Sequence, residues 1–209
     1  MYAVISTDRI QMPPGAVMRI PGTWKDYCQL RDSRGDGSIP RLKYHAGEIL
    51  LMSPLPRHGR EAHLIARIVE IILESQDRNY EAFTPITLEL PEVGGIEPDY
   101  CFYIDNWQAV VGKDRIDWQL DPPPDLVIEI DVTSYTSELD FLPYNVPEVW
   151  LFKNDRLTIY QLADGKYQVS ENSRYFPTFS MQNTIELCVA TAKIKGTGTA
   201  MSEFRRSIG

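Results

Sequence analysis

The residues best suited to chemistry are acids that alternate along one predicted strand, residues 125–132 (DLVIEIDV). Alternate side chains of a strand point to opposite faces, so Asp125, Glu129 and Asp131 share one face and apolar residues occupy the other. The Cα atoms of Glu129 and Asp131 are expected about 6.6 Å apart, given the rise per residue of a strand. This spacing suits two oxygen ligands of one hard cation, although a solvent-exposed face with salt bridges shows the same alternation.

Another acid, Asp99, follows Pro98 at the start of a predicted strand over residues 99–104. Proline restricts the backbone where the strand begins, so Asp99 is expected at a strand end that opens to solvent. Thirty residues separate Asp99 from Glu129, which is enough chain to return a neighbouring strand. An ordinary strand entry can carry the same Pro-Asp pair.

Glu61 lies in the clearest predicted helix, residues 60–76, among the apolar residues Ile65, Ile68 and Ile72 of its buried face. A buried carboxylate without a partner would cost several kcal/mol. If Glu61 is buried, it therefore needs a cation. If it remains in water, it is an ordinary acid near a helix N-terminus, where the helix dipole favours it.

These observations define a candidate site of four acids: Glu61, Asp99, Glu129 and Asp131. Carboxylates that converge at one end of a sheet repel one another unless protons or cations intervene. Mg²⁺ (or Mn²⁺) fits such a site because it binds one or two carboxylates together with water and a substrate phosphate. The predicted chemistry is hydrolysis of a phosphodiester. Acids that each carry their own arginine would instead need no metal.

Other catalytic signatures are weak or missing. The three histidines, His45, His58 and His63, do not have the spacing of a zinc site. His58 follows Arg57 in a proline-rich segment and is expected at the surface. Glycine-rich nucleotide-binding motifs and G-x-S-x-G do not occur. A glycosidase with two carboxylates is chemically conceivable, but the sequence shows no aromatic platform for a sugar.

The elements that must position the acids follow an α/β pattern. Strands predominate in the middle and helices near both ends, which favours an α/β fold with a mixed β-sheet flanked by helices. The predicted helices cover residues 23–33, 60–76, 181–193 and 199–206. The predicted strands cover residues 48–52, 80–90, 99–104, 125–132, 147–152, 156–162 and 166–170. We expect a single domain over residues 1–209, with an N-terminal extension (1–22) and a helical C-terminal tail (180–209), because no repeat or linker divides the chain.

Length and charge limit the class of protein. The 209 residues include 21 Lys and Arg and 29 Asp and Glu, which gives a net charge of −8, and 43% of them are hydrophobic. This balance is typical of a folded protein and excludes a disordered chain and a basic protein that coats DNA. Three cysteines without a C-x-x-C pair indicate a reducing compartment. No signal-peptide pattern or membrane-length apolar run occurs, so we expect a cytoplasmic protein without a membrane partner.

Several segments in a fixed order resemble one family of uncharacterised proteins. They are Glu97–Ile104 (EPDYCFYI), Asp121–Ser134 (DPPPDLVIEIDVTS) and Asn145–Trp150 (NVPEVW), with further similarity at Met52–His58 and Arg156–Tyr160. From about Tyr44 to Pro177 the sequence is similar to putative restriction endonuclease domains, which are placed in the PD-(D/E)xK nuclease superfamily. The resemblance implies a restriction-endonuclease-like core in which Asp99 is the acid of the PD half-motif and Glu129 is the second acid. Both would bind Mg²⁺.

The sequence departs from the superfamily pattern at its lysine. That lysine is expected two residues after the second acid, where Asp131 stands, and residues 137–144 lack the lysine that many family members carry on the following helix. Such a lysine orients the attacking water and offsets negative charge on the phosphate. Either the metal acts without it, or another cation such as Arg60, Arg67 or Lys153 replaces it.

Two hypotheses remain open. The first is an Mg²⁺-dependent endonuclease that cleaves DNA through a cation held by Asp99 and Glu129, with Asp131 and Glu61 assisting. The second is a catalytically degenerate nuclease fold that acts as a binding or dimerisation module. The acidic balance and the missing lysine favour the second, and the acid pair on one strand face favours the first. A homodimer is expected in the first, because a two-fold pair of sites can cleave both strands of a duplex.

Overall fold

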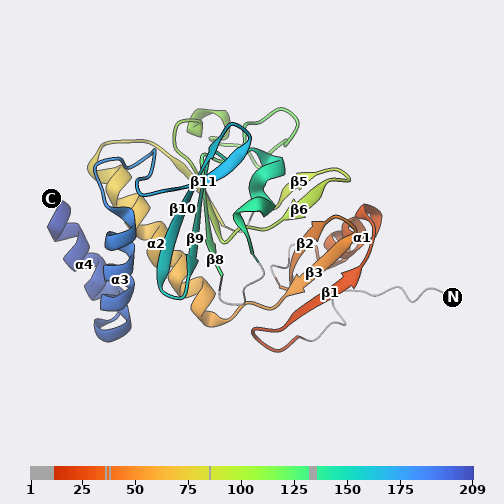
Figure 1. The fold of residues 1–209 in the computed structure, drawn as a ribbon, viewed down its shortest axis with the longest axis horizontal. Helices are drawn as coiled ribbons and strands as arrows, with labels where there is room; N and C mark the ends of the chain where they lie inside the picture. The colour runs from red at the N-terminus through yellow and green to blue at the C-terminus, as the bar shows by residue number, and fades with distance from the viewer. Residues whose placement is uncertain (1–11, 36, 38, 85, 132–135) are drawn as a thin grey trace.

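The computed structural model describes residues 12–35, 37, 39–84, 86–131 and 136–209. Within these ranges the chain forms two β-sheets and four α-helices (Figure 1). The larger sheet has six strands in the order β11-β10-β9-β8-β7-β4, and the smaller has five in the order β1-β3-β2-β6-β5. The smaller sheet and the two C-terminal helices lie at opposite ends of the molecule, with the six-stranded sheet between them (Figure 1).

The six-stranded sheet is mixed. Its strands are β4 (Glu81–Phe83), β7 (Tyr100–Tyr103), β8 (Leu126–Ile130), β9 (Glu148–Lys153), β10 (Arg156–Ala163) and β11 (Lys166–Ser170). Neighbouring strands are antiparallel except β8 and β9, which run parallel at the centre. The predicted hairpin between β10 and β11 is confirmed, and Asp164 and Gly165 both adopt the positive φ angles that a tight turn requires. The predicted mixed α/β class is confirmed.

The second sheet differs from the single sheet that the sequence predicts. Its strands are β1 (Val17–Pro21), β2 (Arg41–His45), β3 (Glu48–Met52), β5 (Leu88–Leu90) and β6 (Gly94–Ile96), and all of its pairs are antiparallel. The predicted strand over residues 80–90 is therefore wrong as one element, because it contributes β4 to one sheet and β5 to the other. Residues 17–21 of the expected extension form an edge strand of the second sheet.

Helices cover the sheets where apolar side chains require burial. Helix α1 (Trp24–Arg34) packs on the second sheet, and Thr23 is its N-cap as predicted. Helix α2 (Pro56–Ser75) packs its apolar face on Leu126, Ile128 and Ile130 of β8. The predicted tail helices are present as α3 (Met181–Lys195) and α4 (Thr197–Ile208), which extend the same apolar core.

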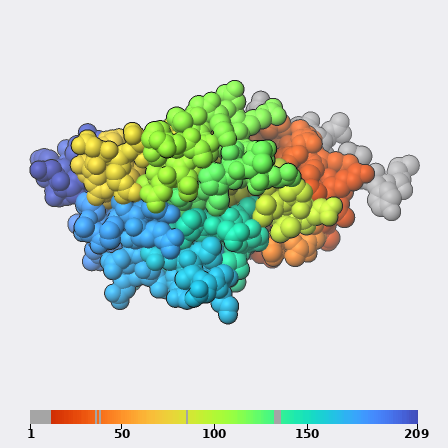
Figure 2. Space-filling model, turned by 90° about the horizontal axis from the view of Figure 1, so that it is seen from above, coloured from red at the N-terminus to blue at the C-terminus, as the bar shows by residue number. Residues whose placement is uncertain are grey.

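The opposite face of the six-stranded sheet is also covered. A 3-10 helix (Glu138–Tyr144) contributes Phe141 to a second core with Val127 and Val149. Viewed from above, the green segments around residues 106–121 extend between the yellow end of α2 and the red and orange N-terminal part (Figure 2). Every residue of β8 is buried as a result, and the interpretation of its acidic face as solvent-exposed is wrong.

Helix α2 begins earlier than predicted. The sequence places a break over residues 53–59, whereas the structure starts the helix at Pro56. Proline is well tolerated in the first helical turn, because the N–H group that it lacks would have no partner there. The early start moves His58 from a loop into the first turn of a buried helix. None of the helices in the described ranges has both the length and the apolar character needed to cross a bilayer.

Candidate functional site

Two of the predicted acids, Asp99 and Glu129, meet at the junction of β7 and β8. The register pairs Tyr100 with Ile128 across these antiparallel strands, which places the preceding Asp99 beside Glu129. The Asp99 backbone N–H donates to Glu129 Oε2 over 3.1 Å, and the Ile130 backbone N–H donates to Asp99 Oδ2 over 2.7 Å. Both acids are buried, at 2% and 5% exposure. The sequence-predicted convergence of this pair is present in the structure.

A cation from the other sheet contacts this pair. Arg41, at the start of β2, places Nη1 2.5 Å from Asp99 Oδ1. Burial alone would lower the pKa of Arg41, but the charges of Asp99 and Glu129 outweigh it and raise the pKa. Two buried carboxyl groups therefore lie near a single guanidinium, so carboxyl groups outnumber cations here.

The imbalance between carboxyl groups and cations favours the protonated form of Glu129. Burial in the sheet, followed by the neighbouring charge of Asp99, raises the pKa of Glu129 to about 8 from an ordinary 4.5, with Arg41 acting in the opposite direction. Thr136 donates its hydroxyl to Glu129 Oε1 over 3.1 Å. A cavity of about 30 Å³, lined in part by Arg41, Glu129 and Thr136, leaves room for a water molecule or a small ion beside the carboxyl group.

The other two predicted acids form a separate pair around a second small cavity. Glu61 Oε1 accepts from Arg57 Nε over 2.7 Å, and Asp131 Oδ2 contacts Lys153 Nζ at 2.9 Å. Glu61 and Asp131 line a cavity of about 30 Å³ together with Arg57, Phe152 and Asn154. Three of the four predicted acids, Asp99, Glu61 and Asp131, thus have a cation of their own.

His58 is part of this region, and its predicted surface position is wrong. Its exposure is 1%, and its Nδ1 accepts from the Leu55 backbone N–H over 3.0 Å. Burial lowers the pKa of His58, and the next strongest influences are the charges of Asp99 and Arg41, so the ring lies within electrostatic reach of both. The signal that the sequence prediction missed is Pro56 as the first residue of the helix. With the helix starting there, His58 and Glu61 are three residues apart on one helix face.

Comparison with known proteins identifies the relatives of this chain. The family model Uma2, described as putative restriction endonuclease, matches residues 24–192. The chain belongs to this family. Among solved structures it is similar to a putative nuclease of DUF820 from Anabaena variabilis, with a TM-score of 0.51 and 17% sequence identity over 87% of this chain and 99% of that one. No curated protein matches the chain.

Three cations of this Uma2 member were candidates to replace the lysine that the resemblance predicts. Arg60 is exposed on α2, and Arg67 pairs with Glu70 over 2.6 Å. Lys153 is different, because the parallel register of β8 and β9 brings it beside Asp131, which stands where the resemblance predicts a lysine. Arg41 was not a candidate in the sequence, because no strand was predicted over residues 41–45, although RLKYH alternates polar and apolar residues.

The acid pair of this Uma2 member meets the modest requirements of Mg²⁺. Among the described residues, no group of three or more His, Cys, Asp or Glu side chains is arranged to hold a metal. Mg²⁺ commonly uses one or two carboxylates and takes its other ligands from water and phosphate. The structural observation that fits is the burial of Glu129 against Asp99, because a cation would relieve the repulsion between these carboxyl groups that helps to raise the pKa of Glu129.

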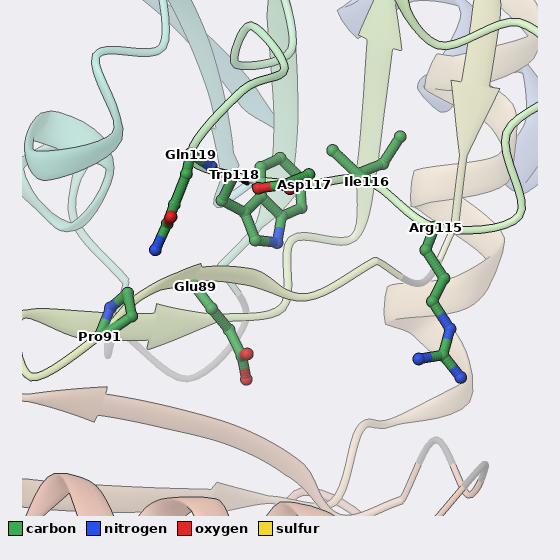
Figure 3. Close-up of a pocket in the computed structure, with 7 residues that line it drawn as sticks. All are labelled: Glu89, Pro91, Arg115, Ile116, Asp117, Trp118 and Gln119. Carbon is green, nitrogen blue, oxygen red and sulfur yellow. Dashed lines mark hydrogen bonds between the residues drawn. The ribbon is translucent and has the colours of Figure 1, made fainter.

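A larger cavity lies away from the predicted acids. It has a volume of about 500 Å³ and is bordered by Glu89 and Pro91 on one side and by residues 115–119 on the other (Figure 3). The Trp118 ring lies between Asp117 and Gln119 in this view, and Glu89 projects from β5 below it. None of the four predicted acids lines this cavity.

Proposed function

We propose that this protein is an Mg²⁺-dependent endonuclease that hydrolyses DNA phosphodiester bonds. The observation that carries the proposal is the buried Asp99–Glu129 pair, in which two carboxyl groups meet and the single guanidinium of Arg41 bonds only to Asp99 of the two. Membership of a family described as putative restriction endonucleases supports it. So does the fold similarity to a structure described as a putative nuclease.

Asp99 and Glu129 would hold the Mg²⁺ (or Mn²⁺) ion, with Asp131 and Glu61 assisting from the second cavity. When bound, the cation would stabilise charge on the phosphate and lower the pKa of a water molecule. The hydrogen bonds from Thr136 and from the Asp99 backbone would hold the Glu129 carboxylate in one orientation. Preorganisation of this kind lowers the cost of assembling charge in the transition state.

Lys153 is our proposed replacement for the superfamily lysine, and its loss tests the assignment. Lys153→Met should reduce cleavage roughly ten- to a hundredfold, because one ammonium near the phosphate is removed. Lys153 is 38% exposed but pairs with the buried Asp131, so thermal unfolding of the variant is measured beside its activity. Initial cleavage rates give the measurement, with Lys166→Met on the exposed end of β11 as the matched control. Full activity of Lys153→Met would show that Lys153 does not replace the superfamily lysine.

The direct test of the proposed function uses supercoiled plasmid with Mg²⁺, Mn²⁺ or EDTA. Wild type should cut the plasmid only in the presence of a divalent cation, and Glu129→Gln should be inactive. Equal cutting by both proteins would mean a contaminating nuclease. No cutting by wild type, together with no metal binding in calorimetry, would contradict the proposal.

We also propose a homodimer, which the same experiment addresses. Two sites related by a two-fold axis would linearise the plasmid in one encounter, whereas one site would accumulate nicked circles. Light scattering on the same preparation should give twice the mass of 23.9 kDa. A monomeric mass at working concentration would contradict the dimer. We place the protein in the cytoplasm, where its three free cysteines would remain reduced.

A second candidate function is a non-catalytic binding module. The observation in its favour is that Asp99, Glu61 and Asp131 each already pair with Arg41, Arg57 and Lys153 respectively. Such pairs need no metal to compensate their charge. Calorimetry separates the two functions, because a module built on these ion pairs would bind neither Mg²⁺ nor Mn²⁺.

A further inference from the structure

The buried ring of His58 has a tautomer that its hydrogen bond defines. Nδ1 accepts from the Leu55 backbone N–H over 3.0 Å, so it carries no proton of its own. The ring proton must then reside on Nε2. The His58 backbone N–H also donates to the Leu55 carbonyl oxygen over 2.9 Å, so two bonds to one residue fix the ring at the start of α2.

The Nε2–H group of His58 has no hydrogen-bond partner among the described residues, although it is fully buried. The two carboxylates whose charges act on the ring, Asp99 and Glu61, already accept other hydrogen bonds. Asp99 receives Arg41 on Oδ1 and the Ile130 N–H on Oδ2, and Glu61 receives Arg57 on Oε1. A buried donor without an acceptor is destabilising and rare in folded proteins, so an acceptor from outside the chain is the natural explanation.

The protonated Nε2 limits which ligand this can be. A metal ion needs a lone pair, which Nε2 cannot offer while Nδ1 is held as an acceptor. An anionic oxygen needs a donor, which Nε2–H is. The first turn of α2 contains no acid, and its dipole favours an anion. A methyl group at Gly59 would meet no atom within 4 Å, so the helix surface at Gly59 itself is open.

We infer that His58 is a substrate-contacting residue whose Nε2–H donates a hydrogen bond to a phosphate oxygen bound beside the Asp99–Glu129 pair. The inference rests on the proposed function, because a phosphodiester is the anion that such a site would take. In this inference a neutral histidine, and not a further cation, recognises one phosphate oxygen.

The first experiment observes the ring directly in metal-free wild-type protein. The chain contains only His45, His58 and His63, so nitrogen-15 NMR of the imidazoles can be assigned with His58→Gln and His63→Gln. Titration with inorganic phosphate should move the His58 Nε2–H proton downfield and slow its exchange with water. The exposed His63, on the same helix, should not respond. Equal or absent responses at both rings would overturn the inference.

The second experiment measures binding of a short DNA duplex in Ca²⁺, which should support binding without turnover. His58→Ala should weaken binding roughly tenfold, the effect of losing one hydrogen bond to a charged group. His58→Gln should retain part of the affinity, because its amide can still donate. His63→Ala is the matched control and should bind as wild type does.

The outcomes separate this inference from the proposed function. A phosphate response at His58 in a protein that does not cut DNA would retain the anion site and contradict the nuclease. Cleavage of DNA with unchanged affinity in His58→Ala, and no phosphate response at His58, would retain the nuclease and overturn the inference. If His58→Ala does not fold, the wild-type titration and His58→Gln decide the question.

Discussion

Asp99→Asn should reduce both Mn²⁺ affinity and DNA cleavage on the order of a hundredfold or more, because it removes one of only two carboxylates proposed to hold the cation. Asparagine keeps the size of the side chain and an oxygen that can accept from the Ile130 N–H. The change therefore removes the charge with little effect on packing. Calorimetric titration with Mn²⁺ measures the first effect, and plasmid cleavage measures the second.

Asp105→Asn is the matched control for this experiment. Asp105 lies shortly after the other end of β7, is exposed and contacts Arg78 only at 3.6 Å. It should bind metal and cut DNA like wild type. Metal affinity that is unchanged in Asp99→Asn would remove Asp99 from the proposed metal site, whatever the cleavage assay shows.

Glu129→Gln should inactivate the enzyme and yet stabilise the metal-free fold at alkaline pH relative to wild type. The pKa of Glu129 is raised to about 8 in the folded protein, against an ordinary 4.5. The folded state therefore binds the proton more tightly than the unfolded state between these values. The free energy of unfolding contributed by this proton is fully present below about pH 4.5 and is lost as pH rises through about 8.

The measurement is urea denaturation in EDTA at several pH values from 5 to about 9.5, a range chosen to bracket that pKa. The stability of wild type relative to Glu129→Gln should fall by several kcal/mol across this range. Glu171 is exposed, so the free energy of unfolding of Glu171→Gln should depend on pH as that of wild type does. Addition of Mg²⁺ at pH 9 should restore the free energy of unfolding of wild type but should not raise that of Glu129→Gln. A constant difference between the two proteins at all pH values would contradict the assigned protonation.

Strong patterns in the sequence predicted the strand and helix that hold most of the site. The alternation in DLVIEIDV identified β8 and placed Glu129 on one face, and the Pro98-Asp99 pair marked the start of β7. The apolar spacing after Arg60 identified α2, but the weight given to proline as a helix breaker hid its first turn and with it the position of His58.

The second sheet could not be predicted in the same way. Strands β5 and β6 have three residues each, too few to show a period of two, whereas β2 alternates polar with apolar residues over five positions and is a strand signal that was overlooked. Arg41 therefore had no element to position it, and its contact with Asp99 depends on packing between residues 58 positions apart. The ion pairs of Asp99 and Asp131 belong to this tertiary level, whereas Arg57 and Glu61 are four residues apart in one helix.

The contact of Arg41 with Asp99 links the two sheets of the protein. Arg41 belongs to the sheet at the N-terminal end of the molecule, and Asp99 belongs to the start of a strand in the other sheet. Any ion that occupied Asp99 Oδ1 would compete with this guanidinium for the same oxygen. Binding of the proposed ion would therefore weaken a contact between the two sheets, so ion affinity would depend on how tightly the sheets pack together.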